Sequence, residues 1–299
     1  MKPFENCTSS SDFILSGFIN LKDFKIPLFF LFLFIYLIIL IENTVIIVLV
    51  STSGHLQTPM YFILKCLSFC ELIYVTNLVP KMMHDLLSEP ATIPVIGCII
   101  QLQIYSTTGN TTSLHYALMS YDRYSAISDP LRYSTIINTR FCRCWVIAFW
   151  LTSFTFAITI SFFLRQLVFC DSNIINHFHC DLNPMVELAS TDTRLLLLTT
   201  AIFSSLILMV PLLFVVFSYI FIIYTILNIP TATGRKKAFS TCSSHLFVVT
   251  ITYSIILSMY MLPRRATTPQ TGSGIKTQQG IGNTEAHYCF LLDNLWWTL

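Results

Sequence analysis

The chain has 299 residues, of which 54% are hydrophobic and only 11% are charged. Soluble domains usually carry about 25% charged residues, and a water-soluble fold of this size could not bury so much apolar surface. The net charge is only +2, with no basic run longer than Arg235-Lys236-Lys237, which argues against a nucleic-acid partner because phosphate neutralisation needs a broad basic face. The composition therefore predicts a membrane protein, with the lipid bilayer as its surroundings.

Residues 1–25 form a polar tail that lacks the short apolar core and the cleavage site of a secretory signal peptide. Asn6 opens an Asn-x-Thr sequon, which can be glycosylated only on the lumenal side of the membrane. Cys98, Cys170 and Cys180 fall in predicted loops or at helix ends, where disulfides need the same oxidising side. The distribution of Lys and Arg barely decides the orientation, so these two features predict an extracellular N-terminal tail.

Apolar segments long enough to cross a membrane follow the tail. A spanning helix needs roughly 20 apolar residues, because each residue rises about 1.5 Å through a hydrocarbon core of about 30 Å. The sequence offers six such spans, over residues 26–50, 61–80, 95–121, 145–164, 195–228 and 238–262. Pro211 lies inside the fifth and predicts a kink there. We therefore expect an all-α membrane protein with one helical bundle over residues 26–263.

Two polar side chains lie in the middle of the first two spans. Asn43 stands beside Glu42 in the first span, and Glu71 lies in the second. Polar groups at membrane depth are costly and need a reason. One reading is hydrogen bonding between helices that fixes their packing, and the other is an ion or proton site at the bundle centre. The sequence leaves both readings open.

The third span ends in an acid followed directly by a base, Asp122-Arg123. Such a pair at the cytoplasmic end of a helix can hold the guanidinium in one conformation and release it in another, which makes a two-state element. Taken alone, the pair is equally explained as a solvated helix end.

Further motifs surround this pair. They are Leu56–Phe62 (LQTPMYF) at the start of the second span, Met119–Tyr124 (MSYDRY), Asp129–Tyr133 (DPLRY), Ser218-Tyr219 and Lys237–Leu246 (KAFSTCSSHL). Together they closely resemble the olfactory receptors, a branch of the rhodopsin-like G-protein-coupled receptors. Asp12–Phe18 (DFILSGF) and Lys237–Leu246 are the motifs most specific to that branch. The resemblance covers about residues 6–263, and it implies a rhodopsin-like transmembrane helical bundle.

The resemblance also implies roles for single residues. Asp122, Arg123, Tyr124 and Tyr219 are the expected switch toward a heterotrimeric G protein of the stimulatory, cAMP-raising class. Cys98 and Cys180 are the expected disulfide between the third helix and the second outer loop. The implied ligand is a small volatile odorant, and the implied location is the plasma membrane.

A ligand pocket can be predicted from the residues that face the bundle interior. Positions at helical spacing on the third span point one face inward, and the fifth and sixth spans add apolar wall and hydroxyl groups. The candidate pocket residues are Tyr105, Ser106, Gly109, Asn110, Phe203, Ile207, Tyr253 and Tyr260. An enclosed, mostly apolar cavity with a few polar groups suits a small organic molecule. The alternative is that these residues only pack the bundle.

Other kinds of site are weakly supported. His177 and His179 stand beside Cys180 and could bind copper or zinc, but we expect Cys180 in the disulfide and predict no metal site. The sequence holds no Ser/His/Asp order with a nucleophile elbow and no Gly-rich phosphate loop. We therefore predict no enzyme activity and no cofactor.

Two of the departures from the family pattern change what we expect of the structure. Ser190 replaces a common cysteine, so Cys170 loses its expected partner, and a free thiol is one reading of it while another disulfide stays open. Residues 264–299 form an atypical tail without the seventh helix and its Asn-Pro-x-x-Tyr motif, because the apolar stretch 288–299 is too short to span. A frameshift or alternative ending is one hypothesis for this tail.

Three functions therefore compete at this stage. The first is a signalling odorant receptor. The second is a truncated or frameshifted product without signalling, which is retained in the endoplasmic reticulum or acts by forming oligomers with full-length receptors. A six-helix channel or transporter is the third, and it lacks the broken helices and inverted repeats expected of that class.

Overall fold

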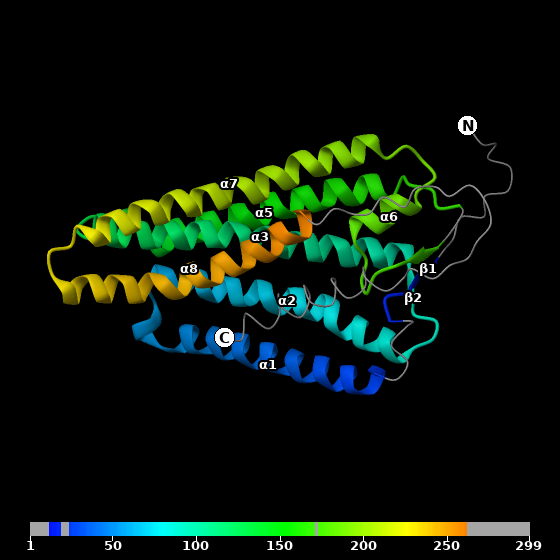
Figure 1. Cartoon of the computed structure of the whole chain (residues 1–299), viewed down its shortest axis with the longest axis horizontal. Helices are drawn as coiled ribbons and strands as arrows, with labels where there is room; N and C mark the ends of the chain where they lie inside the picture. Colours follow the sequence, from blue (N-terminus) through cyan, green and yellow to red (C-terminus); the bar gives the residue numbers. More distant parts are fainter. Residues whose placement is uncertain (1–11, 19–23, 171–172, 262–299) are drawn as a thin grey trace.

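A computed structural model describes residues 12–18, 24–170 and 173–261. The elements in chain order are β1 (Asp12–Leu15), α1 (Lys25–Thr52), the 3-10 helix η2 (Gly54–Leu56), α2 (Pro59–Leu87), β2 (Thr92–Pro94), α3 (Val95–Ser128), α4 (Tyr133–Ile136), α5 (Thr139–Leu164), β3 (Ile174–Ile175), α6 (Leu182–Leu188), α7 (Arg194–Leu227) and α8 (Ala232–Met261). The long helices α1, α2, α3, α5, α7 and α8 run along the long axis of the molecule, and the strands and α6 lie at one end (Figure 1). The fold is the all-α bundle that the sequence predicts.

Local sequence signals explain where the helices begin. Thr58 caps α2 by accepting a hydrogen bond from the Tyr61 amide, and Pro59 follows at the first helical position. Asn138 caps α5 in the same way, through a 2.9 Å hydrogen bond from the Phe141 amide. The helix α7 continues through Pro211, which is buried within it.

The outer surface of the bundle is apolar. Among the described residues, α1, α2, α5 and α7 are long and apolar enough to cross a membrane. Large side chains on them face outward, including Phe30 at 62% exposure and Leu198 at 61%. A surface of this kind is unfavourable in water and suits lipid. The chain is therefore a multi-pass membrane protein.

The helix α3 differs from its neighbours because it lies inside the bundle, packed against α2, α5 and α7. Several of its buried hydroxyl groups bond to carbonyls one turn earlier, as Thr111 does to Thr107 at 2.7 Å and Ser120 to Tyr116 at 3.0 Å. A helix lined by protein can carry these polar groups, since they need no contact with lipid.

A small three-stranded sheet covers one end of the bundle, in the order β2-β1-β3. Strand β1 runs antiparallel to β2 and parallel to β3, with Ile14 opposite Ile174. Phe13 on β1 is fully buried and meets the Phe169 ring edge to face, at 5.0 Å between centroids. The sheet therefore ties the residues before α1 to the loop between α5 and α7.

Candidate functional site at the two ends of the bundle

The Asp122-Arg123 pair lies at the end of the bundle opposite the sheet, and we call this the Asp-Arg end. Arg123 Nη2 lies 2.8 Å from Asp122 Oδ2, and both side chains are largely buried. The hydroxyl of Tyr133, on α4, donates a 2.8 Å hydrogen bond to the other carboxylate oxygen of Asp122. Both oxygens of this carboxylate are thus engaged, which holds Arg123 in place.

Tyr133 is a partner that the sequence did not single out, although it belongs to the Asp129–Tyr133 motif. Burial raises the pKa of Tyr133, and the hydrogen bond to Asp122 raises it further. The phenol therefore stays protonated at physiological pH, as a donor to the carboxylate must.

A second polar contact joins α7 to α8 at the Asp-Arg end. The Tyr219 hydroxyl lies 2.5 Å from His245 Nδ1, and the two rings stack with their centroids 5.7 Å apart. Arg123 is close enough to interact electrostatically with both residues. His245 was noted only as part of the Lys237–Leu246 motif, so its pairing with Tyr219 is a result of the structure.

Tyr124, the fourth expected switch residue, lies apart from these contacts. Its ring packs edge to face on Phe221 of α7, at 6.3 Å between centroids. The structure therefore brings Asp122, Arg123 and Tyr219 into one cluster and places Tyr124 on the packing surface between α3 and α7.

At the other end, which we call the disulfide end, Cys98 and Cys180 form a disulfide with their Cα atoms 5.4 Å apart. The amide of Cys180 also donates a 3.0 Å hydrogen bond to the Gln101 side chain on α3. Gln101 in turn accepts a 2.9 Å hydrogen bond at its carbonyl from Asn77 on α2. The loop after α5 is thus fixed to two helices.

This loop covers Tyr105, the expected pocket residue of α3 that lies nearest the disulfide end. The ring of Tyr105 lies between Tyr74 of α2 and His179 of the loop, at 5.5 Å from each. Burial lowers the pKa of His179 well below its ordinary value, and the neighbouring His177 lowers it further. His179 is therefore a neutral ring against Tyr105, with the His177 ring 4.4 Å away. Within the described residues, no group of three metal-ligating side chains forms around them.

Deeper in the bundle, the expected pocket residues come from three helices. A Cβ atom added to Gly109 would meet nothing within 4 Å, so there is open space beside this residue of α3. On α7, Ile207 is buried, whereas Phe203 is 43% exposed and stacks on Phe156 of α5 at 5.3 Å. Tyr253 of α8 is buried against Tyr116 of α3. Ser106 and Asn110 lie on α3 and are half-buried.

Three predicted features lie outside what the structure describes. They are Asn6, the tail 264–299 and the side chain of Tyr260, whose backbone belongs to α8. Both mid-span polar residues are described and buried. Asn43 donates a 3.0 Å hydrogen bond to the Ile39 carbonyl of its own helix.

The reading of Cys170 as a free thiol is wrong, because Cys170 is disulfide-bonded. The free cysteines among the described residues are Cys66, Cys70, Cys142, Cys144 and Cys242. That reading followed from the replacement of one partner by Ser190. A disulfide needs only that two sulfur atoms come close in the fold, so a missing partner in the usual position does not leave a cysteine free.

Comparison with known proteins shows which family this chain resembles. The family model described as olfactory receptor matches residues 32–270. Olfactory receptor 6B9 of Mus musculus is 42% identical over 260 residues, which are 87% of this chain and 82% of that protein. Olfactory receptor 6B2 of Homo sapiens is 41% identical over 260 residues, with 87% and 83% covered. Olfactory receptor-like protein COR4 of Gallus gallus is 41% identical over 258 residues, with 86% and 83% covered.

Proposed function

The chain belongs to the olfactory receptor family, and we propose that it binds a small volatile organic odorant inside its rhodopsin-like bundle and signals through a stimulatory G protein. The observation that supports this most directly is the cluster of Asp122, Arg123 and Tyr133 beside Tyr219 and His245. Its side-chain contacts connect α3 to α4 and α7 to α8. Such contacts can be exchanged for others without breaking any helix.

The proposed ligand site lies between the two ends. Open space beside Gly109, the Tyr105 ring under the loop and the apolar side chain of Ile207 give a mostly apolar site with few hydroxyl groups. Sites of this composition bind small organic molecules by burial, while the few polar groups orient them. The disulfide between Cys98 and Cys180 holds the covering loop, so less loop entropy is lost when a ligand binds.

In the proposed mechanism, the odorant favours an arrangement of α7 and α8 in which the Tyr219–His245 contact has changed. A ligand shifts such an equilibrium only by its difference in affinity for the two arrangements. Release of Arg123 from Asp122 then exposes a guanidinium to the G protein. Asp122 remains held by the Tyr133 hydroxyl, which keeps the carboxylate partnered when Arg123 leaves.

The proposed location is the plasma membrane, with residues 1–25 and the disulfide end outside and the Asp-Arg end facing the cytoplasm. The sequon at Asn6 and the disulfides support this orientation, since both need the lumenal side during synthesis. The proposed bundle covers residues 26–263, with α3 crossing the membrane as a protein-lined helix and α8 crossing beside α7.

A surface-labelling and cAMP assay tests this proposal. The full chain, carrying an N-terminal tag, is expressed in cells, labelled without permeabilisation and exposed to a panel of odorants. We expect surface label and a cAMP rise with at least one odorant, and loss of that rise in Arg123→Ala at equal surface label. Normal surface label without any cAMP rise would count against signalling and favour a non-signalling member of the family. Label found only after permeabilisation would favour retention in the endoplasmic reticulum.

A further inference from the structure

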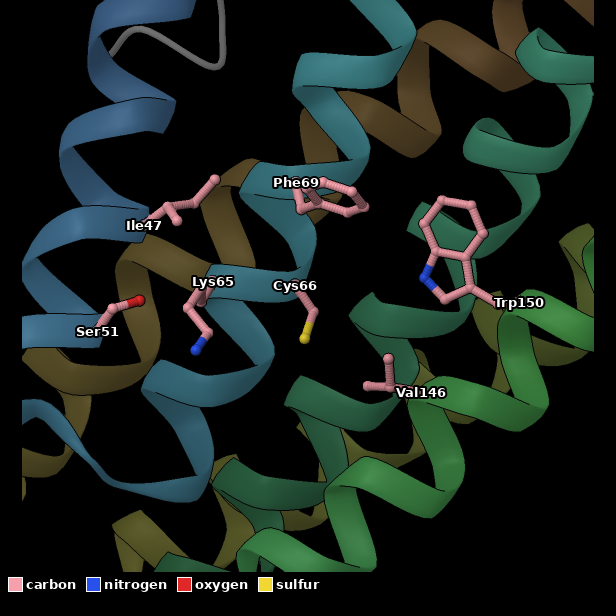
Figure 2. Close-up of a pocket in the computed structure, with 7 residues that line it drawn as sticks. All are labelled: Ile47, Ser51, Lys65, Cys66, Phe69, Val146 and Trp150. Atoms are coloured by element: carbon pink, nitrogen blue, oxygen red, sulfur yellow. The ribbon is translucent and has the colours of Figure 1, made fainter.

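A cavity of about 350 Å³ lies between α1, α2 and α5, on a face of the bundle that the proposed odorant site does not use (Figure 2). It is lined by Ile47, Ser51, Lys65, Cys66, Phe69, Val146 and Trp150. Val146 is 8% exposed and Phe69 is 53% exposed. The cavity therefore has a buried floor and a rim on the apolar outer surface of the bundle, where lipid lies. Its volume is within the range of sites that hold small organic groups.

The position of the cavity along the helices matches the depth of one lipid leaflet. Ser51 is next to the last residue of α1, and Lys65 is six residues into α2, or roughly 9 Å from its start. Trp150 is eleven residues into α5, roughly 17 Å from its start. One leaflet of hydrocarbon is about 15 Å thick, half of the core. Polar groups thus lie near the helix ends and aromatic rings near the bilayer centre.

Lys65 is the charged residue of this cavity. It belongs to none of the ion pairs found among the described residues. Its Nζ atom lies over the Phe62 ring, 5.8 Å from the ring centroid. The other lining side chains carry no negative charge. An ammonium group at this depth is expensive unless an anion or the headgroup layer neutralises it.

We propose that this cavity binds an anionic phospholipid, whose headgroup pairs with Lys65 and whose acyl chain lies against Phe69 and Trp150. These two rings lie 6.3 Å apart between centroids and form an apolar wall across α2 and α5 (Figure 2). A sterol would offer only a hydroxyl to Lys65. A zwitterionic lipid has no net negative charge to balance the ammonium. The unpaired positive charge therefore selects a lipid with net negative charge, of which phosphatidylserine is a suitable probe.

Lipid retention by the full chain tests this proposal without odorant or G protein, so its outcome is independent of the proposed function. The chain is purified into nanodiscs of phosphatidylcholine with phosphatidylserine or with cholesterol. The protein is then released from the nanodiscs, and native mass spectrometry measures the lipids that remain bound to it. Both leaflets carry the same lipids, so the result does not depend on orientation. We expect retained phosphatidylserine in preference to both other lipids.

Three variants separate the cavity from general attraction to anionic membranes. Lys65→Gln should weaken phosphatidylserine retention roughly fivefold, the effect of one basic residue near a membrane surface. Lys65→Arg keeps the charge and should retain the lipid. Lys236→Gln removes an exposed positive charge of α8, a helix that does not line the cavity, and should behave as the unchanged chain.

A further variant changes the floor and leaves Lys65 in place. Val146→Phe should fill the cavity and reduce retention as Lys65→Gln does. Peptide mapping of the disulfide between Cys98 and Cys180 shows for each variant that the bundle has formed. Equal retention in Lys65→Gln and the unchanged chain, equal loss in Lys236→Gln, or preferred retention of cholesterol would each overturn the proposal.

Discussion

The disulfide end and the Asp-Arg end of the bundle are held together by different kinds of bond. At the disulfide end, a covalent bond and strand pairing connect segments far apart in the sequence. At the Asp-Arg end, non-covalent contacts of side chains connect α3 to α4 and α7 to α8. The difference indicates that one end provides a fixed frame for a ligand site and the other can rearrange. The following predictions test that division, from the largest effect to the smallest.

Removing the disulfide should have the largest effect on stability. The bond joins residues 82 apart, and closing a loop of this size contributes about 4 to 5 kcal/mol in the chain-entropy model. We expect Cys98→Ser to abolish most surface label and to lower the thermal midpoint of the detergent-solubilised chain. Cys144→Ser, which removes an exposed free thiol, is the control. Equal surface label for the two variants would show that the disulfide end is not the fixed frame.

Replacing the carboxylate of the Asp-Arg end should release Arg123. Asp122→Asn leaves a largely buried guanidinium without its partner, and breaking a buried pair costs about 3 to 5 kcal/mol. Some of that cost favours the arrangement in which Arg123 has moved away. We expect higher cAMP without odorant per surface receptor, together with lower stability.

The matched control for that variant is Asp129→Asn, because Asp129 forms a 3.9 Å pair with Arg132 on the exposed surface. Exposed pairs contribute little, so neither basal cAMP nor stability should change. A rise in basal cAMP of the same size in both variants would contradict a switch at Asp122.

Loss of one hydrogen bond to the same carboxylate should have a smaller effect. Tyr133→Phe removes the 2.8 Å bond to Asp122, and hydrogen bonds to charged groups contribute about 1.5 to 3 kcal/mol. We expect a thermal midpoint below that of the unchanged chain but above that of Asp122→Asn. Tyr224→Phe, at a residue 68% exposed, should leave it unchanged. A Tyr133→Phe midpoint equal to that of Tyr224→Phe would mean that the bond does not hold the pair.

The disulfide end should also weaken at low pH. The pKa of His179 is lowered in the folded chain, so the folded state favours the neutral imidazole. The contribution of His179 to the free energy of unfolding is therefore complete above the ordinary pKa of about 6.5, and it is lost as the pH falls below that value. Between pH 7 and 5.5 the loss is at most about 1 kcal/mol. Thermal melts should show this slope, and His179→Gln should remove it. His55→Gln, at an exposed residue of η2, should keep it, and an unchanged slope in His179→Gln would refute the assignment.

The second disulfide offers a test with little effect on folding energy. We expect non-reducing peptide mapping to find Cys170 joined to Cys7 rather than to Cys289. The strand β1 runs parallel to β3, and the Asn173 side chain donates a 3.1 Å hydrogen bond to the Asp12 carbonyl. Asp12 and Asn173, which begin two described segments, therefore lie side by side. A bond to Cys289 would instead connect the loop to the last residues of the chain.

The sequence predicts the bundle better than it predicts the contacts at its ends. Long apolar runs and caps such as Thr58 are local signals, so the helices follow from them. The strand pair of Ile14 with Ile174 and the contact of Tyr219 with His245 join residues far apart in the sequence. No local pattern of residues predicts such contacts. Tyr133 and His179 were present in noted motifs, but only the fold shows that one bonds Asp122 and the other covers Tyr105. The free-thiol reading of Cys170 failed because it took an expected partner position as the only one.

The order of strands in the sheet also has a consequence for synthesis in the cell. β1 is the first described element, yet its parallel partner β3 is translated 160 residues later. At about 5 to 20 residues per second, the ribosome needs roughly 8 to 32 s to reach Ile174 after Ile14. During that time α1, α2, α3 and α5 have all been made. β1 can therefore pair with β3 only after most of the bundle has entered the membrane. Newly made chains interrupted before residue 174 can therefore pair β1 with β2 but not with β3.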